Sequence, residues 1–518
     1  MDELLTMAQM RACEDAAIAS GAAGGAGLME RAGAAVVGAL AEAWPGLRPG
    51  SALVLCGPGN NGGDGHVIAR LLVQAGWRVR LLAHGDPARQ GADATLMRRR
   101  WAAIGDTGPL DAEAVAAALP VDLVVDAVFG AGAVREMTGD PAGAFALLAR
   151  RRDAAGKVVA VDAPSGLCLD SGFYPGCPRA ALPDTALRAD LTVTFHRARP
   201  GQYLGHGPDV CGRLHVADIG LTGAPEDAMR RVAVAPGSAG AAALDKGQGH
   251  KFSHGAVLVV SGPAQGSGAA RLAARAALRI GAGLVTLGAA PGDLATLAPA
   301  LEAVMLRGLE DGAALAAWLE ADPRITALCI GPGLGTGPRE AGLVAAALRA
   351  RRPVVLDADA LTLLARQPGL RALLHPACVL TPHEGEFARL APDLVAASRP
   401  GERAPLPSRA DAARALARRL GVSVLLKGRA SVIAEPQGRV RLHAAAYDRA
   451  APWLATAGAG DVLAGLIAGL LARGVAPPEA AALAAFVHVE AARAFGPGLI
   501  ASDLPDLVPQ ALARIAAG

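Results

Sequence analysis

The sequence predicts an α/β protein built from two consecutive domains, each with a parallel sheet. First, its 518 residues exceed one domain, because a domain usually takes about 100–200 residues. Second, short runs rich in Val and Leu alternate with helical stretches, a pattern typical of parallel strands covered by helices on both faces. Third, this alternation lapses once, over residues 221–249, which are rich in Gly, Pro and Ala. We therefore expect a domain over residues 1–222, a linker over 223–244 and a second domain over 245–518.

The strands of the first half are short apolar runs, and two of them end in Asp. They are expected over residues 51–57, 77–85, 121–130, 156–166 and 189–201. A helix over residues 65–75 is expected after the first of them.

The second half also alternates predicted strands with helical stretches, but its motifs come in a different order. Its strands are expected within residues 254–263, 324–335, 352–361, 377–386 and 422–431. A long Ala-rich helical region follows "TAGAGDVLAG" at residues 456–465.

Composition and charge exclude several classes of protein. The apolar run Val462–Ala472 is too short to span a bilayer, which needs about 20 residues, and the first residues lack the basic start of a secretory signal. A net charge of +3 without a basic arm argues against a nucleic-acid partner. The seven Cys form no CxxC pair, which favours reduced thiols. We expect a cytoplasmic homo-oligomer of unspecified size that binds small molecules and no membrane.

Three polar features of the first half follow predicted strands. They are "GNNGGDG" at residues 59–65, Asp126, and Asp162 with Ser165. Ligands of parallel sheets collect at the carboxyl ends of the strands. The glycines are expected to supply positive φ and close backbone approach, and the helix start to attract a phosphate. Oxygen donors from Asn, Asp and Ser suit a hard cation better than zinc. The alternative is an ordinary turn followed by helix caps.

The second half places a candidate base at the start of a helix. Gly458 and Gly460 precede Asp461, so backbone N–H groups there would bind an anion while Asp461 accepts a proton. Lys427 and the Gly428 backbone could meet phosphates. Further polar residues at strand ends are Asp357, Asp359, His383, Glu384 and Glu386. The spacing His-Glu-x-Glu is not a zinc motif, which excludes a metalloprotease. Helix capping is the alternative role for Asp461.

The first half also resembles a known family. "LLTMAQMR", "LMERAG", "GPGNNGGDG", "DAVFGAG", "VDAPSG" and "TFHRARPG" are similar to the N-terminal epimerase domain of NAD(P)HX repair enzymes over about residues 1–220. The resemblance implies a Rossmann-like fold that interconverts the R and S epimers of hydrated NADH or NADPH. That reaction needs the C6 hydroxyl to leave and return, or the ring to open, and a carboxylate can move the proton. Asp162 is the candidate.

The resemblance also implies the residues of this site. Substrate contacts are expected from Asn60, Asn61, Gly62, Gly63, Asp64, Gly130, Ala131, Gly132, Ala133, Val134, Arg135, Glu136 and Asp162. A potassium ion is expected on Asn61, Asp126 and Ser165. Arg199 stands where the family often has Lys, and Arg31 where Asn is common. Neither is expected to touch the site.

The second half resembles the ADP- or ATP-dependent NAD(P)HX dehydratase of the ribokinase-like superfamily over about residues 245–515. The resemblance rests on "GHKFSHGAVLVVSG", "GPGLG", "LDADAL", "TPHEGE", "LKG" and "GAGDVLAG". It implies hydrate contacts from Ala269, Gly335, His383 and Asp461. Nucleotide contacts are implied for Lys427, Gly428, Arg429, Ala430, Ser431 and Gly460, with magnesium accompanying ADP or ATP. The loop "GPAQGSGAA" lacks the usual Met, and Ala459 replaces a common Thr or Met.

The predicted function is nicotinamide nucleotide repair by a bifunctional isomerase and lyase. The enzyme would epimerise R- and S-NAD(P)HX and dehydrate the S epimer at the expense of ADP or ATP. One alternative is a ribokinase-like kinase of a small vitamin precursor fused to a non-catalytic Rossmann-like binding domain, and another is a scaffold protein. An NAD-dependent dehydrogenase is excluded because no GxGxxG is followed by an acidic residue at about 20 positions. The choices between ADP and ATP, and between NADHX and NADPHX, stay open.

Overall fold

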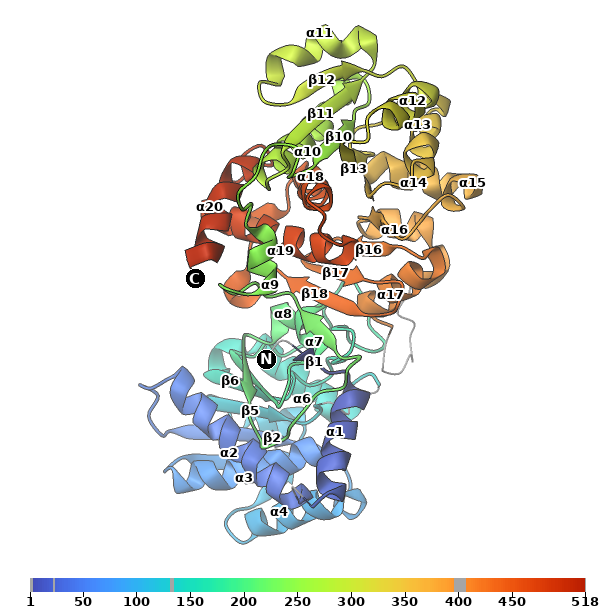
Figure 1. Cartoon of the computed structure of the whole chain (residues 1–518). Coiled ribbons are helices and arrows are strands. Elements are labelled where there is room, and N and C mark those ends of the chain that lie inside the picture. Colours follow the sequence, from blue (N-terminus) through green and yellow to red (C-terminus); the bar gives the residue numbers. More distant parts are fainter. Residues whose placement is uncertain (1–2, 22–23, 131–134, 396–406, 518) are drawn as a thin grey trace. The chain divides into compact units, whose positions relative to one another are not determined.

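The computed structural model describes residues 3–21, 24–130, 135–395 and 407–517, which divide into two compact units (Figure 1). Of the described residues, the first unit is built from 3–229 and 407–408, and the second from 230–395 and 409–517. Both are α/β units with largely parallel sheets, which confirms the predicted fold class. Within the part of the chain that the structure describes, no helix has both the length and the apolar character needed to cross a lipid bilayer.

The first unit contains a seven-stranded parallel sheet in the order β4-β3-β2-β5-β6-β7-β8. The strands are β2 (Ser51–Cys56), β3 (Arg78–Ala83), β4 (Thr107–Pro109), β5 (Leu123–Ala127), β6 (Lys157–Val161), β7 (Leu191–Phe195) and β8 (Arg213–Ala217). The strand order reverses between β2 and β5. Such a switch point leaves a crevice outside the carboxyl ends of the strands, where ligands bind.

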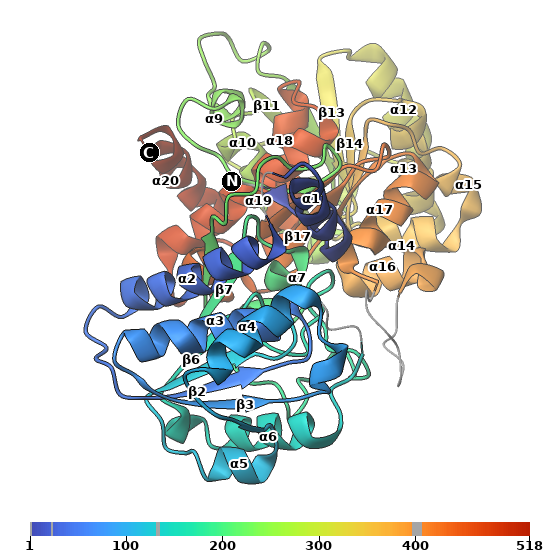
Figure 2. The same cartoon turned by 90° about the horizontal axis from the view of Figure 1, so that it is seen from below.

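Helices cover both faces of this sheet (Figure 2). The first face carries α1 (Met7–Ala19), α2 (Gly25–Ala43) and α3 (Asn60–Gln74), with α4 (Ala92–Ala102) beside α3. The second face carries α5 (Ala112–Ala116) and α6 (Gly139–Arg150). Because side chains alternate along a strand, Val54 and Leu55 of β2 enter opposite cores.

The glycine-rich stretch after β2 differs from its prediction. A loop was expected over residues 59–65, but α3 already begins at Asn60. Gly59, Gly62, Gly63 and Gly65 all lack positive φ, so that expectation was wrong. Close approach is the reason for two of them: a Cβ on Gly62 would overlap the Gly57 carbonyl, and one on Gly65 would lie 2.7 Å from the Cys56 sulfur. The glycines let α3 pack directly on the end of β2.

The second unit contains a larger, mixed sheet. Its strand order is β9-β18-β17-β16-β15-β14-β13-β10-β11-β12. The bounds are β9 (Met229–Arg231), β10 (Ala256–Val260), β11 (Leu284–Ala289), β12 (Met305–Gly308), β13 (Ile325–Ile330), β14 (Val354–Leu356), β15 (Cys378–Leu380), β16 (Ser423–Leu426), β17 (Ala430–Ala434) and β18 (Val440–Ala444). Strands β10 to β16 are parallel, whereas β17 is antiparallel to β16 and β18.

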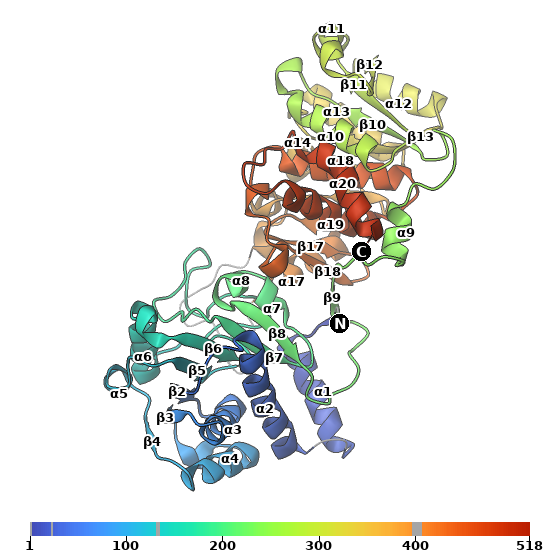
Figure 3. The same cartoon turned by 90° about the vertical axis from the view of Figure 1, so that its left-hand side faces the viewer.

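Two groups of helices accompany this sheet. One group packs into the main apolar core and consists of α10 (Gly268–Arg279), α18 (Ala459–Ala472), α19 (Pro477–Phe495) and α20 (Leu504–Ala517), of which Figure 3 shows α10, α18 and α20 together. The other group lies on the opposite side in Figure 1: α12 (Gly312–Ala321), α13 (Pro338–Arg349), α14 (Ala358–Arg366), α16 (Glu384–Leu390) and α17 (Arg409–Leu420). The shorter helices of this unit are α9 (Ala239–Leu244), α11 (Leu294–Leu297) and α15 (Pro368–Arg371), whereas the short helices α7 (Pro200–Tyr203) and α8 (Gly207–Val210) belong to the first unit.

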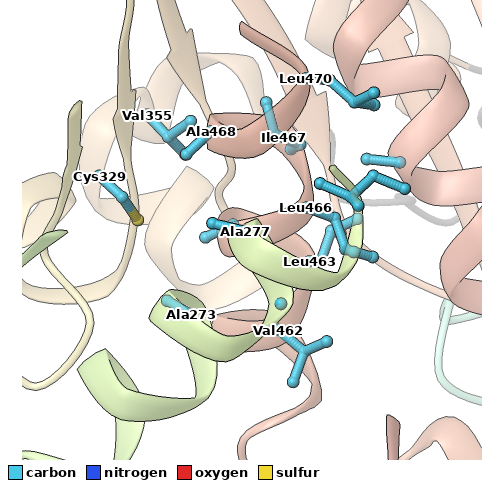
Figure 4. Packing of buried hydrophobic residues seen from close by; sticks show 14 of the residues in the cluster. Ala273, Ala277, Cys329, Val355, Val462, Leu463, Leu466, Ile467, Ala468 and Leu470 are labelled. Carbon is cyan, nitrogen blue, oxygen red and sulfur yellow. The ribbon is translucent and has the colours of Figure 1, made fainter. Parts of the chain in front are cut away.

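Helices α10 and α18 meet along a seam of small residues (Figure 4). A Cβ on Gly465 would overlap the backbone of Ala273, and one on Gly469 would overlap Ile280 and approach Ala277. Only glycine therefore allows the two backbones to come this close. The seam fixes the beginning of α18 relative to the beginning of α10.

The expected linker contains regular structure. Strand β9 pairs with β18 through Arg230 and Arg231, and α9 contributes the buried Leu244 to the core of the second unit.

Candidate active sites

In the first unit, a buried carboxylate lies at the switch point of the sheet. Asp126 ends β5 with 1% of its surface exposed. The backbone N–H of Ser165 donates to its Oδ2 at 2.8 Å, and the Ser165 hydroxyl donates to its Oδ1 at 2.5 Å. Burial raises the pKa of Asp126 to about 6, although the Ser165 hydrogen bonds oppose the shift. No Lys or Arg of the described residues forms an ion pair with it. A cation beside Asp126 would compensate the cost of this buried charge.

Asn61 joins the loop after β5, the strand that carries this carboxylate, to the end of β6. In the amide orientation that satisfies both ends, its nitrogen donates to the Val161 carbonyl at 3.2 Å and its oxygen accepts from the Gly130 N–H at 3.1 Å. Asn61, Asp126 and Ser165 all offer oxygen atoms, and one carries an uncompensated charge. This donor chemistry fits a potassium ion.

Asp162 follows β6 in an unusual backbone conformation. Its φ is 64°, in the left-handed region that non-glycine residues seldom adopt. The Gln202 amide donates to its carbonyl at 2.9 Å, and the Thr194 hydroxyl donates to its carboxylate at 2.8 Å. Arg199 Nη2 lies 3.7 Å from the same carboxylate oxygen, and Arg199 is 1% exposed. The expectation that Arg199 stays clear of the site was therefore wrong, because the turn after β7 folds it beneath Asp162.

Two more acids surround Asp162. Glu14 of α1 was not predicted; burial and then the charge of Asp162 raise its pKa. Asp64, in the first turns of α3, has a pKa raised well above its usual range by burial, Asp162 and Glu14. Of the other predicted contacts, Arg135 and Glu136 are exposed, whereas residues 131–134 lie outside the described residues.

In the second unit, α18 begins as the sequence predicts. Its N-cap is Gly458, whose φ of 91° requires glycine, and the first helical N–H bond runs from Val462 to the Gly458 carbonyl at 3.2 Å. Within the described residues, the N–H groups of Gly460 and Asp461 donate to no carbonyl, so they are available to an anion.

The Asp461 carboxylate accepts no hydrogen bond from the described residues, so it does not cap α18. Burial, followed by the charge of Asp357, raises the pKa of Asp461 to about 6. Glu386 and Asp359 raise it further, and Lys427 opposes them. A carboxylate with this pKa is well suited to general-base chemistry near neutral pH.

A cavity of about 760 Å³ opens beside the start of α18, large enough for a small-molecule ligand. Of the predicted residues, His383, Lys427, Gly428, Arg429, Ser431 and Gly460 line it. Ala430, at the start of β17, is 3% exposed and not among the lining residues. The other wall of the cavity is mainly apolar and includes Leu454, His443 and His488. Burial lowers the pKa of His443 to about 3 and that of His488 to about 4, so both are neutral. Sequence reasoning missed this wall, because no motif marks it.

Lys427 connects the cavity to the buried acids. Its Nζ lies 2.6 Å from Asp357 Oδ1 and 3.8 Å from Glu386 Oε2. The Arg409 guanidinium donates to the Lys427 carbonyl at 2.6 Å and so holds the loop after β16.

The predicted hydrate contacts occupy neighbouring loops. His383 is the N-cap of α16: its ring nitrogen accepts from the Gly385 N–H at 3.0 Å, so it has a structural role as well as a place at the cavity. The Gly335 N–H donates to Asp359 Oδ2 at 2.8 Å. Ala269 is the second residue of α10. It lies next to the loop that contains Gly333 and Gly335, because a Cβ placed on Gly333 would be 3.4 Å from the Cβ of Ala269.

Comparison with known proteins points to the same chemistry for both halves. Residues 25–201 match a family described as the YjeF-related protein N-terminus, and residues 257–513 match the NAD(P)H-hydrate dehydratase family. A bifunctional NAD(P)H-hydrate repair enzyme of Salinibacter ruber is 38% identical over 94% of this chain and 92% of its own length. An NAD(P)H-hydrate epimerase of Rhodobacter capsulatus is 47% identical over 39% of this chain and 91% of its own length. Among solved structures, an ADP/ATP-dependent NAD(P)H-hydrate dehydratase of Bacillus subtilis aligns with a TM-score of 0.43 and 27% identity, over 54% of this chain and 99% of that one.

Proposed function

This chain belongs to the family of bifunctional NAD(P)H-hydrate repair enzymes, and we propose that its two units divide the repair between them. As a member of that family it is an isomerase and a lyase: it epimerises hydrated NAD(P)H and dehydrates it with ADP or ATP. We assign the epimerase to residues 3–229 and the dehydratase to residues 230–518. This boundary keeps Arg230 and Arg231 of β9, which pair with β18, and the helix α9 with the sheet and core that they join.

In the epimerase unit, Asp162 moves the proton. Its carboxylate is oriented by Thr194 and lies near Arg199, and its backbone is fixed by Gln202. Protonation of the C6 hydroxyl releases water and leaves a cationic nicotinamide ring, which a carboxylate stabilises. Addition of water to the other face of the ring then gives the other epimer. Asp64 is the neighbouring acid, and burial together with the charges of Asp162 and Glu14 raises its pKa.

Asn61, Asp126 and Ser165 would hold a potassium ion in this unit. The ion would supply the positive charge that the buried Asp126 lacks. It would also fix Asn61, whose amide joins the loop after β5 to the end of β6 beside Asp162. We expect epimerase activity to depend on potassium for this reason.

In the dehydratase unit, the hydroxyl of the S hydrate becomes a leaving group by phosphorylation. Asp461 removes its proton while the oxygen attacks the terminal phosphoryl group of ADP or ATP, which would enter with magnesium. The phosphoanhydride bond to that group breaks, and AMP or ADP leaves. The free N–H groups of Gly460 and Asp461 and the Lys427 ammonium bind the moving phosphoryl group. Phosphate then leaves C6, C5 loses a proton, and the dihydronicotinamide ring is restored.

The observation that carries this proposal is the start of α18. There the Asp461 carboxylate and the N–H groups of Gly460 and Asp461 have no hydrogen-bond partner among the described residues, and Gly460 and Lys427 line a cavity. The test is incubation of the full chain with R,S-NADHX, ADP and magnesium, with and without potassium, while the absorbance of NADH is followed. Complete recovery of NADH from both epimers is expected. Recovery of the S epimer alone would refute the epimerase assignment, and no recovery would refute both.

For the cell, we propose a cytoplasmic homo-oligomer; all seven cysteines are free thiols, which fits a reducing compartment. Size measurement by light scattering tests the oligomer.

A further inference from the structure

Asp357 occupies a helix-capping position without capping the helix. It is the N-cap of α14, a position that Asp favours because its carboxylate accepts first-turn N–H groups. Here the side chain makes no such bond. It is 1% exposed and lies against the Lys427 ammonium, at 2.6 Å. The following Ala358 has a φ of 47°, which is unfavourable for a residue with a side chain. The Asp357 carboxylate therefore pairs with Lys427 instead of capping α14, and the backbone beside this pair is strained at Ala358.

Lys427 is held on one side only. Its ammonium has three N–H groups, and Asp357 accepts one of them. Glu386, at 3.8 Å, is beyond hydrogen-bond distance, and no other described residue accepts from it. The ammonium lies over the first turn of α18, since a Cβ on Gly460 would be 3.2 Å from Nζ. Two N–H groups are thus left for a ligand beside the free amides of Gly460 and Asp461.

We propose that Asp357 is a positioning residue that anchors the Lys427 ammonium at the start of α18 and keeps it from pairing with Asp461. This inference rests on the proposed nucleotide site. A lysine released from Asp357 would turn to the nearest remaining carboxylates, Glu386 and Asp461. Pairing with Asp461 would weaken the base and withdraw the ammonium from the phosphoryl group.

The charges around Asp461 support a second readout. They come from Asp357 and Asp359 at the start of α14, Glu386 on α16 and Lys427 after β16. Loss of the Asp357 charge lowers the pKa of Asp461 directly, and a released Lys427 lowers it further. Both effects have the same sign.

A double-mutant cycle on ADP binding by the full chain tests the anchor. Asp357→Asn keeps shape and capping ability but removes the charge, and Lys427→Met removes the ammonium. Each single change should weaken ADP binding in calorimetry, Lys427→Met by about tenfold, because a charge-assisted bond is lost. The double variant should bind no more weakly than Lys427→Met alone, because Asp357 acts only through that lysine. Asp393→Asn, which breaks an exposed pair with Arg419, is the matched control and should bind normally. Additive losses would overturn the proposal.

The pH dependence of turnover gives the independent readout. In Asp357→Asn, the acid limb of the kcat profile should move to lower pH by about one unit, which corresponds to a modest change in charge interaction. An unshifted limb would also overturn the proposal. A wild-type chain that binds ADP but fails to dehydrate the S hydrate would refute the proposed function, while the binding cycle would still decide the role of Asp357.

Discussion

Replacing Asp461 by Asn should cost catalysis and increase stability at the same time. The change keeps the size of the side chain but removes its basicity. Loss of a general base lowers a rate by about 10²–10⁴-fold, so the chemical step should slow on that scale while ADP still binds. Single-turnover measurement with the S hydrate and ADP isolates this step.

The stability gain follows from the pKa of about 6 that burial and Asp357 impose on Asp461, against an ordinary 3.8. A shift of about two units makes the ionised form about 3 kcal/mol less favourable in the folded unit, an upper bound because the side chain is only partly buried. For an acid with a raised pKa, this cost is absent below pH 4 and is complete above pH 6. Asp461→Asn should therefore unfold at higher denaturant concentration than wild type at pH 8, and the difference should vanish near pH 4.

The pH dependence of wild-type turnover is a further measurement, because Asp461 must be ionised to act as a base. The kcat for dehydration should fall tenfold per pH unit below about pH 6. If Asp461 only stabilised the helix start, Asn would serve equally well and turnover would stay near normal. An unimpaired chemical step in Asp461→Asn therefore refutes the base assignment.

Three further predictions concern the division of labour. Asp126→Ala should impair R-to-S conversion and remove its potassium dependence while dehydration of the S epimer continues; normal epimerisation would mean that the ion site is misplaced. Gly62→Ala should abolish epimerisation and destabilise the first unit by about 1–3 kcal/mol, because its methyl group would strike the Gly57 carbonyl, whereas Gly59→Ala, with open space around it, serves as the control. A fragment of residues 230–518 should dehydrate the S epimer with ADP and leave the R epimer, and equal consumption of both would contradict the assignment.

Local sequence predicted features that depend on neighbouring residues in the chain. The start of α18 is one example: backbone N–H groups for an anion, with Asp461 beside them, were expected from "GAGD", whereas the positive φ of Gly458 was not predicted. The strand-end acids Asp126 and Asp162 are another, because the end of a parallel strand in this fold faces the crevice by topology.

Contacts between distant segments escaped prediction. Arg199 was not expected to touch the site, yet the turn after β7 brings it to Asp162. Glu14 lies on α1 just after the motif "LLTMAQMR" but outside it, and burial and the charge of the distant Asp162 raise its pKa. The glycines of α3 were assigned to positive φ because a single sequence cannot distinguish conformational freedom from close packing. Asp357 was recognised as polar, but its partner Lys427 stands 70 residues away.

The glycine seam between α10 and α18 also determines which parts of the dehydratase can move. With the backbones in contact at Gly465 and Gly469, neither helix can slide or roll without a steric clash. Ala269, at the start of α10, and Asp461, at the start of α18, therefore behave as points on one rigid body. Any closure around the ligands must come from the opposite wall, made by the hairpin of β17 and β18 and the loop before α18. A bulkier residue in the seam would shift the base without touching it, so activity could be lost through a substitution several turns away from the chemistry.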